Sequence, residues 1–301
     1  MKINKLIKKL LKGLSLIVLT ITLAGVMKVF LFASFKVPTG SMEPTILPGD
    51  FVLVNKLLIG PRIYRDFGFL KGRKTPYKRI KGMQPIRRND VLVFDAPYIA
   101  AGFLNKIPNQ YYIKRCVAIS GDTLLIENGK LKIAKHPPTP LQRGIENYMD
   151  SVGGVLGQQK LSQMSQNDFP PDIWQCFPFD TVYYRWNIKD FGPLYIPAQN
   201  DKLELNQQNI VLYKPLIQYE TQKTITVKEG RLFLGEEPLS SYTFTRNYYF
   251  MAGDNVTGSY DSRYWGLLPE DFVVGKATII WKSKDSQTGK FRWKRFLKVI
   301  Q

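Results

Sequence analysis

The apolar positions of this chain fall into two patterns that meet near residue 35 of 301. Leu14–Phe35 is apolar except for Lys28 and a few hydroxyl residues, and no polar face interrupts it. A helix rises about 1.5 Å per residue, so this run can match the roughly 30 Å hydrocarbon core of a bilayer. Residues 1–13 carry five lysines and no acid, which favours a cytoplasmic N-terminus. We therefore predict a cytoplasmic basic segment (1–13) and one transmembrane helix (14–35).

Two other interpretations of this segment stay open. It could be a secretory signal peptide that is cut after Ala24. It could also be a buried helix of a soluble protein, although such a helix usually has a polar face. The apolar run continues past Ala24 to Phe35, which favours a single-pass anchor followed by a large exported domain.

Beyond residue 35 the apolar runs are short and are separated by Gly, Pro and Asn, which is typical of strands joined by turns. The clearest runs are Phe51–Lys56, Asp90–Phe94, Tyr111–Ile119 and Phe272–Trp281. Asn128-Gly129, between two apolar runs, is typical of a tight hairpin turn. The predicted fold class is therefore mainly β, preceded by one N-terminal helix.

Composition divides the exported part further. Residues 134–245 are enriched in Gln, Asn, Pro and aromatic residues, which suggests a second lobe inserted into a β core. That core would comprise residues 36–133 and 246–282. Residues 283–301 form a basic, aromatic tail that would lie against a membrane surface or cap the core.

The net charge of +19 favours anionic neighbours, either nucleic acid or an acidic lipid surface. Ile59–Asn89 is basic with interleaved aromatic residues, and it could bind either one or be a solvated loop. Cys116 and Cys176 form no CxxC pair, which argues against a zinc site, so we expect no metal and no cofactor. Whether the two cysteines form a disulfide is left open by the sequence.

Three stretches carry candidate chemistry. Val37–Asp50 (VPTGSMEPTILPGD) is rich in Pro and Gly, so it predicts a rigid loop that presents Ser41. Lys114 lies inside an apolar strand, where burial would lower the pKa of its amine, unless it is an edge-strand lysine that reaches water. Such a neutral amine could activate a serine hydroxyl.

The third stretch, Tyr248–Gly266, runs from an apolar strand into a turn-rich loop. If its end is extended, Ser259, Asp261 and Arg263 share one face, and the last two could pair. Otherwise it is a surface loop with one weak salt bridge. The single histidine, His136, precedes two prolines near the edge of the predicted insert, which makes a Ser-His-Asp triad improbable.

In order and spacing, these pieces resemble the bacterial type I signal peptidases, which are also called leader peptidases. The resemblance rests on the N-terminal anchor and four motifs, which are PTGSMEPTILPGD, RNDVLVFDAP, YYIKRCVAISGD and GDNVTGSYDSRYWG. The motifs cover a small part of the chain, and the predicted insert adds little to the match. The resemblance implies a signal-peptidase-like catalytic β core and a membrane serine endopeptidase with a Ser/Lys dyad.

By motif position, the resemblance implies that Ser41 is the nucleophile and Lys114 the general base. It implies that Thr39 and the Ser41 N–H are the oxyanion donors and that Ser259 orients the lysine. Asp261 and Arg263 would be a supporting pair. The residues that would line pockets for small, alanine-like side chains are Val37, Pro38, Met42, Tyr112 and Ile113.

The resemblance further implies substrates and a location. The enzyme would remove signal peptides from exported preproteins after small residues in an A-x-A pattern, and its partners would be those preproteins and the lipid bilayer, with no nucleic acid. It would sit in the bacterial inner (plasma) membrane, with the catalytic domain on the outer, periplasmic side. Two departures stand out: Val256-Thr257-Gly258 replaces the usual Arg-Asp-Asn, and Thr39 replaces a common serine.

Three other functions are compatible with parts of this sequence. A related Ser/Lys peptidase could have a narrower substrate, such as one dedicated precursor. A LexA-like self-cleaving repressor uses the same residue types, but the anchor and the lack of a DNA-binding N-terminal domain argue against it. A membrane-tethered binding or scaffold protein would use its basic loops and leave Ser41 inert.

Overall fold

The computed structural model describes residues 2–26, 30–66, 68, 75–135 and 161–301. Most of its regular elements are strands, which confirms the mainly β class. The strands in chain order are β1 (Phe32–Lys36), β2 (Asp50–Asn55), β3 (Arg62–Tyr64), β4 (Tyr77–Arg79), β5 (Val91–Ala100), β6 (Phe103–Ala118), β7 (Asp122–Glu127), β8 (Lys130–Lys135), β9 (Phe191–Tyr195), β10 (Lys202–Glu204), β11 (Ile225–Lys228), β12 (Arg231–Leu234), β13 (Glu237–Pro238), β14 (Ser241–Thr243), β15 (Tyr248–Ala252), β16 (Leu268–Pro269), β17 (Val273–Ser283) and β18 (Lys298–Val299).

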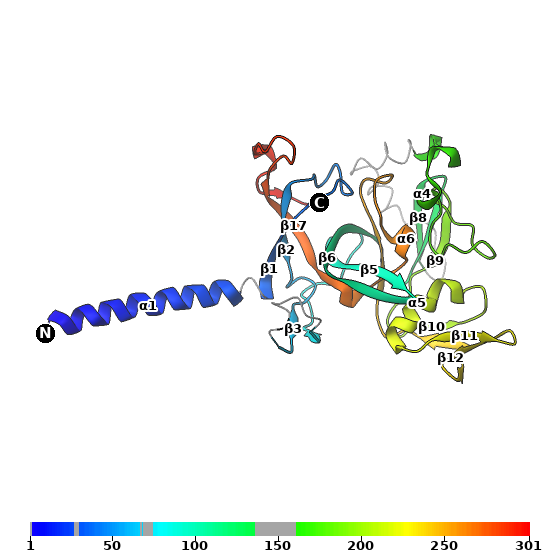
Figure 1. Cartoon of the computed structure of the whole chain (residues 1–301), viewed down its shortest axis with the longest axis horizontal. Coiled ribbons are helices and arrows are strands. Elements are labelled where there is room, and N and C mark those ends of the chain that lie inside the picture. The colour runs from blue at the N-terminus through cyan, green and yellow to red at the C-terminus, as the bar shows by residue number, and fades with distance from the viewer. Residues whose placement is uncertain (1, 27–29, 67, 69–74, 136–160) are drawn as a thin grey trace.

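The helices are fewer and, apart from the first, short. The α-helices are α1 (Lys2–Val26), α4 (Pro171–Trp174), α5 (Ile210–Thr221) and α6 (Ser262–Trp265). The 3-10 turns are η3 (Gln166–Asp168), η4 (Glu270–Phe272) and η5 (Trp293–Arg295). Figure 1 shows α1 projecting away from the β-rich domain that all the other elements build.

One large antiparallel sheet organises the described residues. Its order is β1-β2-β17-β5-β6-β15-β16, with β18 added beside β17. Strands from both ends of the chain therefore lie side by side at its centre, because β17 pairs with β2 on one side and with β5 on the other. This topology brings the loop before β2, the strand β6 and the segment after β15 together.

Smaller sheets surround the large one. The hairpin β7–β8 turns at Asn128 and Gly129, whose φ angles of 47° and 76° fit the predicted tight turn. β9 pairs with β7, so a strand of the predicted insert adds to a hairpin of the predicted core. β10–β14 and β11–β12–β13 form two further small sheets.

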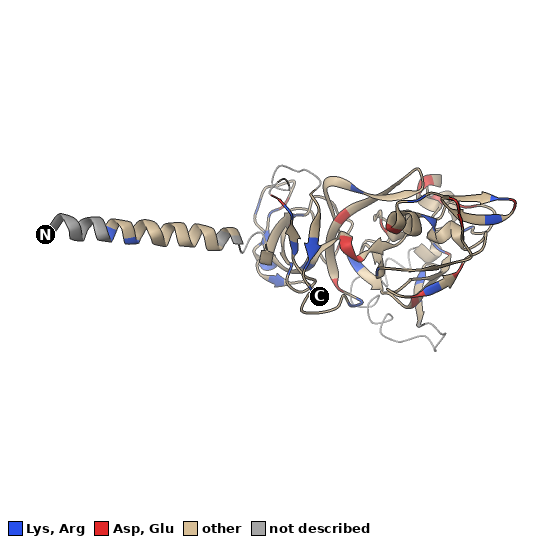
Figure 2. Cartoon of the chain, turned by 90° about the horizontal axis from the view of Figure 1, so that it is seen from below, with Lys and Arg blue, Asp and Glu red and all other residues tan. Residues whose placement is uncertain are grey.

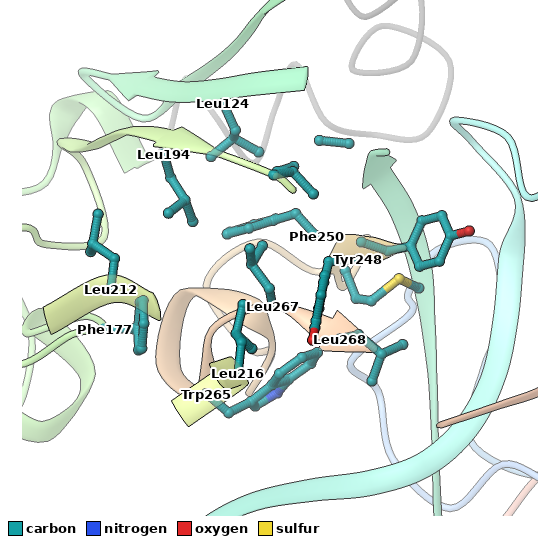
Figure 3. Close-up of a cluster of buried hydrophobic side chains, with 14 of the residues drawn as sticks. Leu124, Phe177, Leu194, Leu212, Leu216, Tyr248, Phe250, Trp265, Leu267 and Leu268 are labelled. Atoms are coloured by element: carbon teal, nitrogen blue, oxygen red, sulfur yellow. The ribbon is translucent and has the colours of Figure 1, made fainter. Parts of the chain in front are cut away.

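The main hydrophobic core contains residues from both the predicted β core and the predicted insert. Leu124 and Phe250 of the predicted core meet Phe177, Leu194 and Leu216 of residues 134–245 in one buried cluster (Figure 3). The described part of residues 134–245 is therefore packed onto the β core, and a separate lobe stays a prediction.

The first helix differs from the prediction at its C-terminal end. α1 ends at Val26, and Phe32–Lys36 form the edge strand β1, in which Phe35 lies opposite Val52. The predicted end of the membrane helix at Phe35 is therefore wrong. Ala33 and Phe35 pack against a buried cluster of the sheet, which explains why these apolar residues form a strand instead of part of the helix. Among the described residues, none of the helices is both long enough and apolar enough to span a bilayer.

Candidate active site

The loop that carries Ser41 connects β1 to β2 and has no regular secondary structure, as its prolines and glycines predict. Its apolar residues Val37, Met42 and Ile46 are 2%, 0% and 0% exposed and sit in a core cluster below it. The loop is closed at its base, where Val37 N–H donates to the Asp50 carbonyl and Gly49 N–H to the Val37 carbonyl, both at 2.8 Å. Buried anchors and a closed base hold Ser41 in place from below.

Lys114 reaches Ser41 from β6. The lysine lies opposite Leu92 of β5, within the buried half of the strand. Its Nζ donates a hydrogen bond to Ser41 Oγ at 2.6 Å, and the two residues are only 5% and 8% exposed. The chain thus joins an amine and a hydroxyl that are 73 residues apart in sequence. The two residues predicted to form the dyad are therefore in direct contact.

The surroundings of Lys114 favour its neutral form. Burial, with a further contribution from the Arg263 cation, lowers the pKa of Lys114 to about 8. The Asp261 and Asp254 carboxylates oppose this effect without overcoming it. At a pH near 8 a substantial fraction of the amine can therefore accept a proton.

Ser259 lies beside the dyad, across Gly253. A methyl group built on Gly253 would come within 2.1 Å of Ser259 Oγ and 2.4 Å of the Ser41 carbonyl oxygen. Ser259 Oγ is buried and makes no hydrogen bond of ordinary geometry with any described residue. The hydrogen bond to Lys114 that would orient the amine is therefore not formed in this structure, and that role stays a prediction.

Asp261 and Arg263 do pair, but the backbone between them is not extended. Asp261 is the N-cap of α6, and its carboxylate accepts from Arg263 Nε and Nη2 at 2.8 Å each. The assumption that Ser259, Asp261 and Arg263 alternate along a strand is therefore wrong. Gly253 N–H also donates to Asp261 at 3.0 Å, so this buried pair holds the segment beside the dyad.

The pair also shifts two pKa values. Burial alone would raise the pKa of Asp261, but Arg263 and the hydrogen bonds to the carboxylate hold it below its usual range. The same carboxylate raises the pKa of Arg263 despite its burial. Both groups therefore stay charged inside the protein.

The other predicted site residues lie around this centre. Thr39 and Pro38 are exposed on the Ser41 loop, while Val37 and Met42 are core residues beneath it. On β6, Tyr112 and Ile113 are half-buried and pack against different core clusters. Val37 and Met42 could touch a substrate only through an opening into the core.

Sequence reasoning missed two structural features of the site. Asn255 hydrogen-bonds the backbone on both sides of Ser41, through its own N–H and its Nδ2. Arg115, next to Lys114, forms a fully buried bidentate pair with Asp254 at 2.9 and 2.7 Å. The turn at Gly253–Gly258 indicated an ordered loop, but no local pattern showed which distant backbone it contacts.

The remaining candidates are the two cysteines, the histidine and a metal site. Cys116 and Cys176 are free, buried thiols, which settles the question that the sequence left open. His136 lies outside the described residues. Across the described ranges, no group of three or more His, Cys, Asp or Glu residues is arranged to hold a metal ion.

A buried lysine amine in contact with a buried serine hydroxyl is an arrangement typical of a serine hydrolase. The family model described as "Signal peptidase, peptidase S26" matches residues 9–183 and 192–282. The chain belongs to this family and is a serine endopeptidase.

Three bacterial proteins named "Signal peptidase I" illustrate the similarity. The protein of Buchnera aphidicola (from Schizaphis graminum) is 29% identical over 93% of this chain and 79% of its own length. Those of Haemophilus influenzae and Pseudomonas aeruginosa are 26% and 28% identical, over 90% and 86% of this chain and 70% and 67% of their own lengths. Family membership supports signal-peptide removal and substrates that carry signal peptides.

Proposed function

We propose that the chain cleaves signal peptides with Ser41 as nucleophile and neutral Lys114 as general base. The observation that carries this proposal is the buried 2.6 Å contact between their side chains. A serine hydroxyl is a weak nucleophile at neutral pH and needs an adjacent base, which a lysine with a pKa of about 8 can supply.

The reaction proceeds in two steps. Ser41 Oγ attacks the scissile carbonyl carbon while its proton moves to the Lys114 amine, and a tetrahedral oxyanion forms. Lys114 then gives that proton to the leaving amine as the peptide bond breaks, which leaves an acyl-enzyme. In the second step Lys114 takes a proton from a water molecule as the water attacks the ester, and it then gives this proton to Ser41 Oγ as the ester bond breaks.

The oxyanion needs donors aimed at it. We assign this role to the Thr39 hydroxyl and the Ser41 N–H, both on the same loop as the nucleophile. In a known serine protease, loss of one such donor costs about 2.7–4 kcal/mol of transition-state stabilisation. In the same proposal Ser259 orients Lys114 once substrate binds, because its hydroxyl is buried next to the dyad.

We propose cleavage after small residues in the A-x-A pattern that signal peptides share. Pro38, Tyr112 and Ile113 would contact the substrate directly, while Val37 and Met42 would form the floor of the pockets. An apolar floor close to the nucleophile suits methyl-sized side chains better than large or charged ones.

We also propose that α1 is the helical part of a membrane anchor, although its described residues alone do not meet the length and hydrophobicity of a bilayer span. It has 25 residues and is about 37 Å long at about 1.5 Å per residue. Its large apolar side chains from Leu10 to Leu23 are each more than half exposed, and basic residues are coloured only near its N-terminal part (Figure 2). This distribution favours a cytoplasmic N-terminus and a catalytic domain on the periplasmic side of the inner membrane of a bacterium.

The tail is consistent with the same location. Phe291, Trp293 and Phe296 are 49%, 74% and 52% exposed beside basic residues of residues 283–301. Aromatic and basic side chains together favour the lipid–water interface. In this proposal residues 36–133 and 246–282 form the catalytic core, 134–245 a lobe packed on it, and 283–301 a membrane-facing tail.

The proposal is tested by incubating the purified full chain in detergent with several exported precursors and sequencing the new N-termini. We expect cleavage of most precursors after a small residue, and none by Ser41→Ala. Cleavage of a single precursor would instead favour a dedicated maturation protease. No cleavage of any precursor by a folded chain would refute the assigned activity.

A further inference from the structure

Asn255 connects the segment after β15 to the loop that carries Ser41. Its backbone N–H donates to the Ser41 carbonyl oxygen at 3.1 Å, and its Nδ2 donates to the Gly40 carbonyl oxygen at 3.1 Å. These two carbonyls belong to the peptide groups on either side of the Ser41 Cα. With both groups fixed, the direction in which Ser41 projects its side chain is fixed as well.

The bond to Gly40 has a second consequence. The Gly40 carbonyl and the Ser41 N–H belong to one planar peptide group and point in opposite directions. When Asn255 Nδ2 holds the carbonyl from one side, the Ser41 N–H must point to the other side. This N–H is the backbone donor that we assign to the oxyanion.

The loop around Asn255 leaves room for this side chain. Gly258 N–H donates to the Asn255 carbonyl at 3.1 Å, which closes a turn over Val256 and Thr257. A methyl group built on Gly258 would lie 2.7 Å from Asn255 Nδ2 and 3.0 Å from its Cγ. The segment Val256-Thr257-Gly258 thus forms a tight turn in which the residue that faces the Asn255 amide, Gly258, has no side chain.

We propose that Asn255 is a positioning residue that aims both the Ser41 hydroxyl and the Ser41 N–H, and that Gly258 provides the space for its amide. The proposal rests on Ser41 being the nucleophile, as proposed above. Asn255 acts through the Ser41 backbone, so it sets geometry without tuning the base.

Asn255→Ala and Asn255→Asp test this role in the full chain. Alanine removes the amide, and an ionised aspartate keeps its shape but has no donor for the Gly40 carbonyl. We expect kcat to fall roughly 10- to 100-fold for both variants, since small misplacements of a reacting group have effects of this order. For Asn255→Ala, which adds no charge, KM, the melting temperature and the pH midpoint of the reaction should stay at the wild-type values. Asn209→Ala is the matched control, because Asn209 Nδ2 donates to the Glu204 carbonyl at 2.8 Å on an exposed turn.

Gly258→Ala tests the same role with the amide still present. We expect a smaller fall in kcat, and the double variant Asn255→Ala/Gly258→Ala should be no slower than Asn255→Ala alone, because both changes act through one amide. Wild-type kcat in Asn255→Ala, or losses that add in the double variant, would overturn the positioning role. If instead the proposed function were wrong, so that Ser41 and Lys114 were not the catalytic dyad, Ser41→Ala or Lys114→Met would remain active.

Discussion

Lys114 and Ser41 meet although they come from different parts of the sheet, with Nζ 2.6 Å from Oγ and almost no solvent at either residue. The lysine is fixed by β6 between two paired strands, and the serine by a loop whose apolar residues enter the core. Both side chains are thus held before any substrate arrives, as a catalytic dyad requires.

Removing either member should abolish turnover. Lys114→Met keeps most of the packing volume of the lysine stem but has no basic nitrogen, and Ser41→Ala has no nucleophile. We expect both variants to lose at least about 1,000-fold in kcat, since residues of a nucleophilic unit contribute on this scale. Preprotein cleavage measures this, with circular dichroism as the control for folding. Near-normal turnover by Lys114→Met would exclude the lysine as the base.

Gly253→Ala should impair catalysis more than its size suggests. The added methyl would lie 2.1 Å from Ser259 Oγ and 2.4 Å from the Ser41 carbonyl oxygen, so Ser259 and the backbone at Ser41 or Gly253 must shift. We expect roughly 100-fold slower cleavage. Gly13→Ala is the control, because an added methyl there meets no atom within 4 Å. A Gly253→Ala enzyme with wild-type kcat would show that the site tolerates this shift.

The Asp261–Arg263 pair should matter for stability as well as activity. Asp261→Ala leaves the buried Arg263 guanidinium without its partner and removes the acceptor of the Gly253 N–H. Breaking a buried pair from one side typically costs about 3–5 kcal/mol of unfolding free energy. Urea unfolding of the variant measures this loss. Replacing both residues together, as Asp261→Leu/Arg263→Met, should cost less than Asp261→Ala, and a larger loss would contradict the account.

Charges placed along α1 should release the protein from membranes. Val18→Arg/Leu19→Arg puts two cations at positions that are 56% and 62% exposed in the middle of the helix. Each would cost roughly 2.5–3.5 kcal/mol at a bilayer centre on insertion scales. We expect the variant in the soluble fraction after cell lysis, while the wild type sediments with membranes. Equal sedimentation of both proteins would count against α1 as the anchor.

The stability of the wild type should depend on pH through Lys114. Its folded pKa of about 8 lies below its ordinary value of 10.5, so between these values the unfolded chain binds more protons than the folded one. The free energy of unfolding should therefore rise with pH across this window. Below about pH 8 Lys114 is protonated in both states, so it adds no pH dependence there. Comparison of wild type with Lys114→Met by urea unfolding isolates the effect. If wild type and Lys114→Met showed the same dependence of stability on pH, groups other than Lys114 would be responsible for it.

The contact between Ser41 and Lys114 was predicted because both residues lie in motifs that resemble those of a known family, whereas each local cue alone left other interpretations open. A Pro- and Gly-rich loop marks Ser41, and a lysine within an apolar strand marks Lys114. The positions that it missed depend on distant contacts, as with Asn255, whose amide reaches a carbonyl 215 residues away. The Asp261–Arg263 pair was predicted, but its geometry was not, because a four-residue helix with an Asp N-cap gives little periodicity.

The end of the first helix was mispredicted for a related reason. Phe32–Lys36 continue the apolar run of α1, and hydrophobicity alone does not tell a membrane helix from an edge strand. Pairing with β2 makes this segment a strand. Because β2 comes after the loop that carries Ser41, the local sequence of the segment does not show this partner. Likewise, Val37 and Met42 were predicted to line pockets by motif position, but burial beneath the loop depends on the whole sheet.

The pH dependence of Ser41 acylation tests the central claim most directly. The wild-type chain is treated with a serine-reactive acylating probe across pH 6 to 10, and labelling of Ser41 is followed by mass spectrometry. If Lys114 must be neutral to accept the Ser41 proton, the acylation rate should rise with pH to a midpoint near the Lys114 pKa of about 8 and then level off. In Lys114→Met the labelling should be lost across the whole range. Acylation of Ser41 at the same rate and with the same pH profile in both proteins would contradict the account.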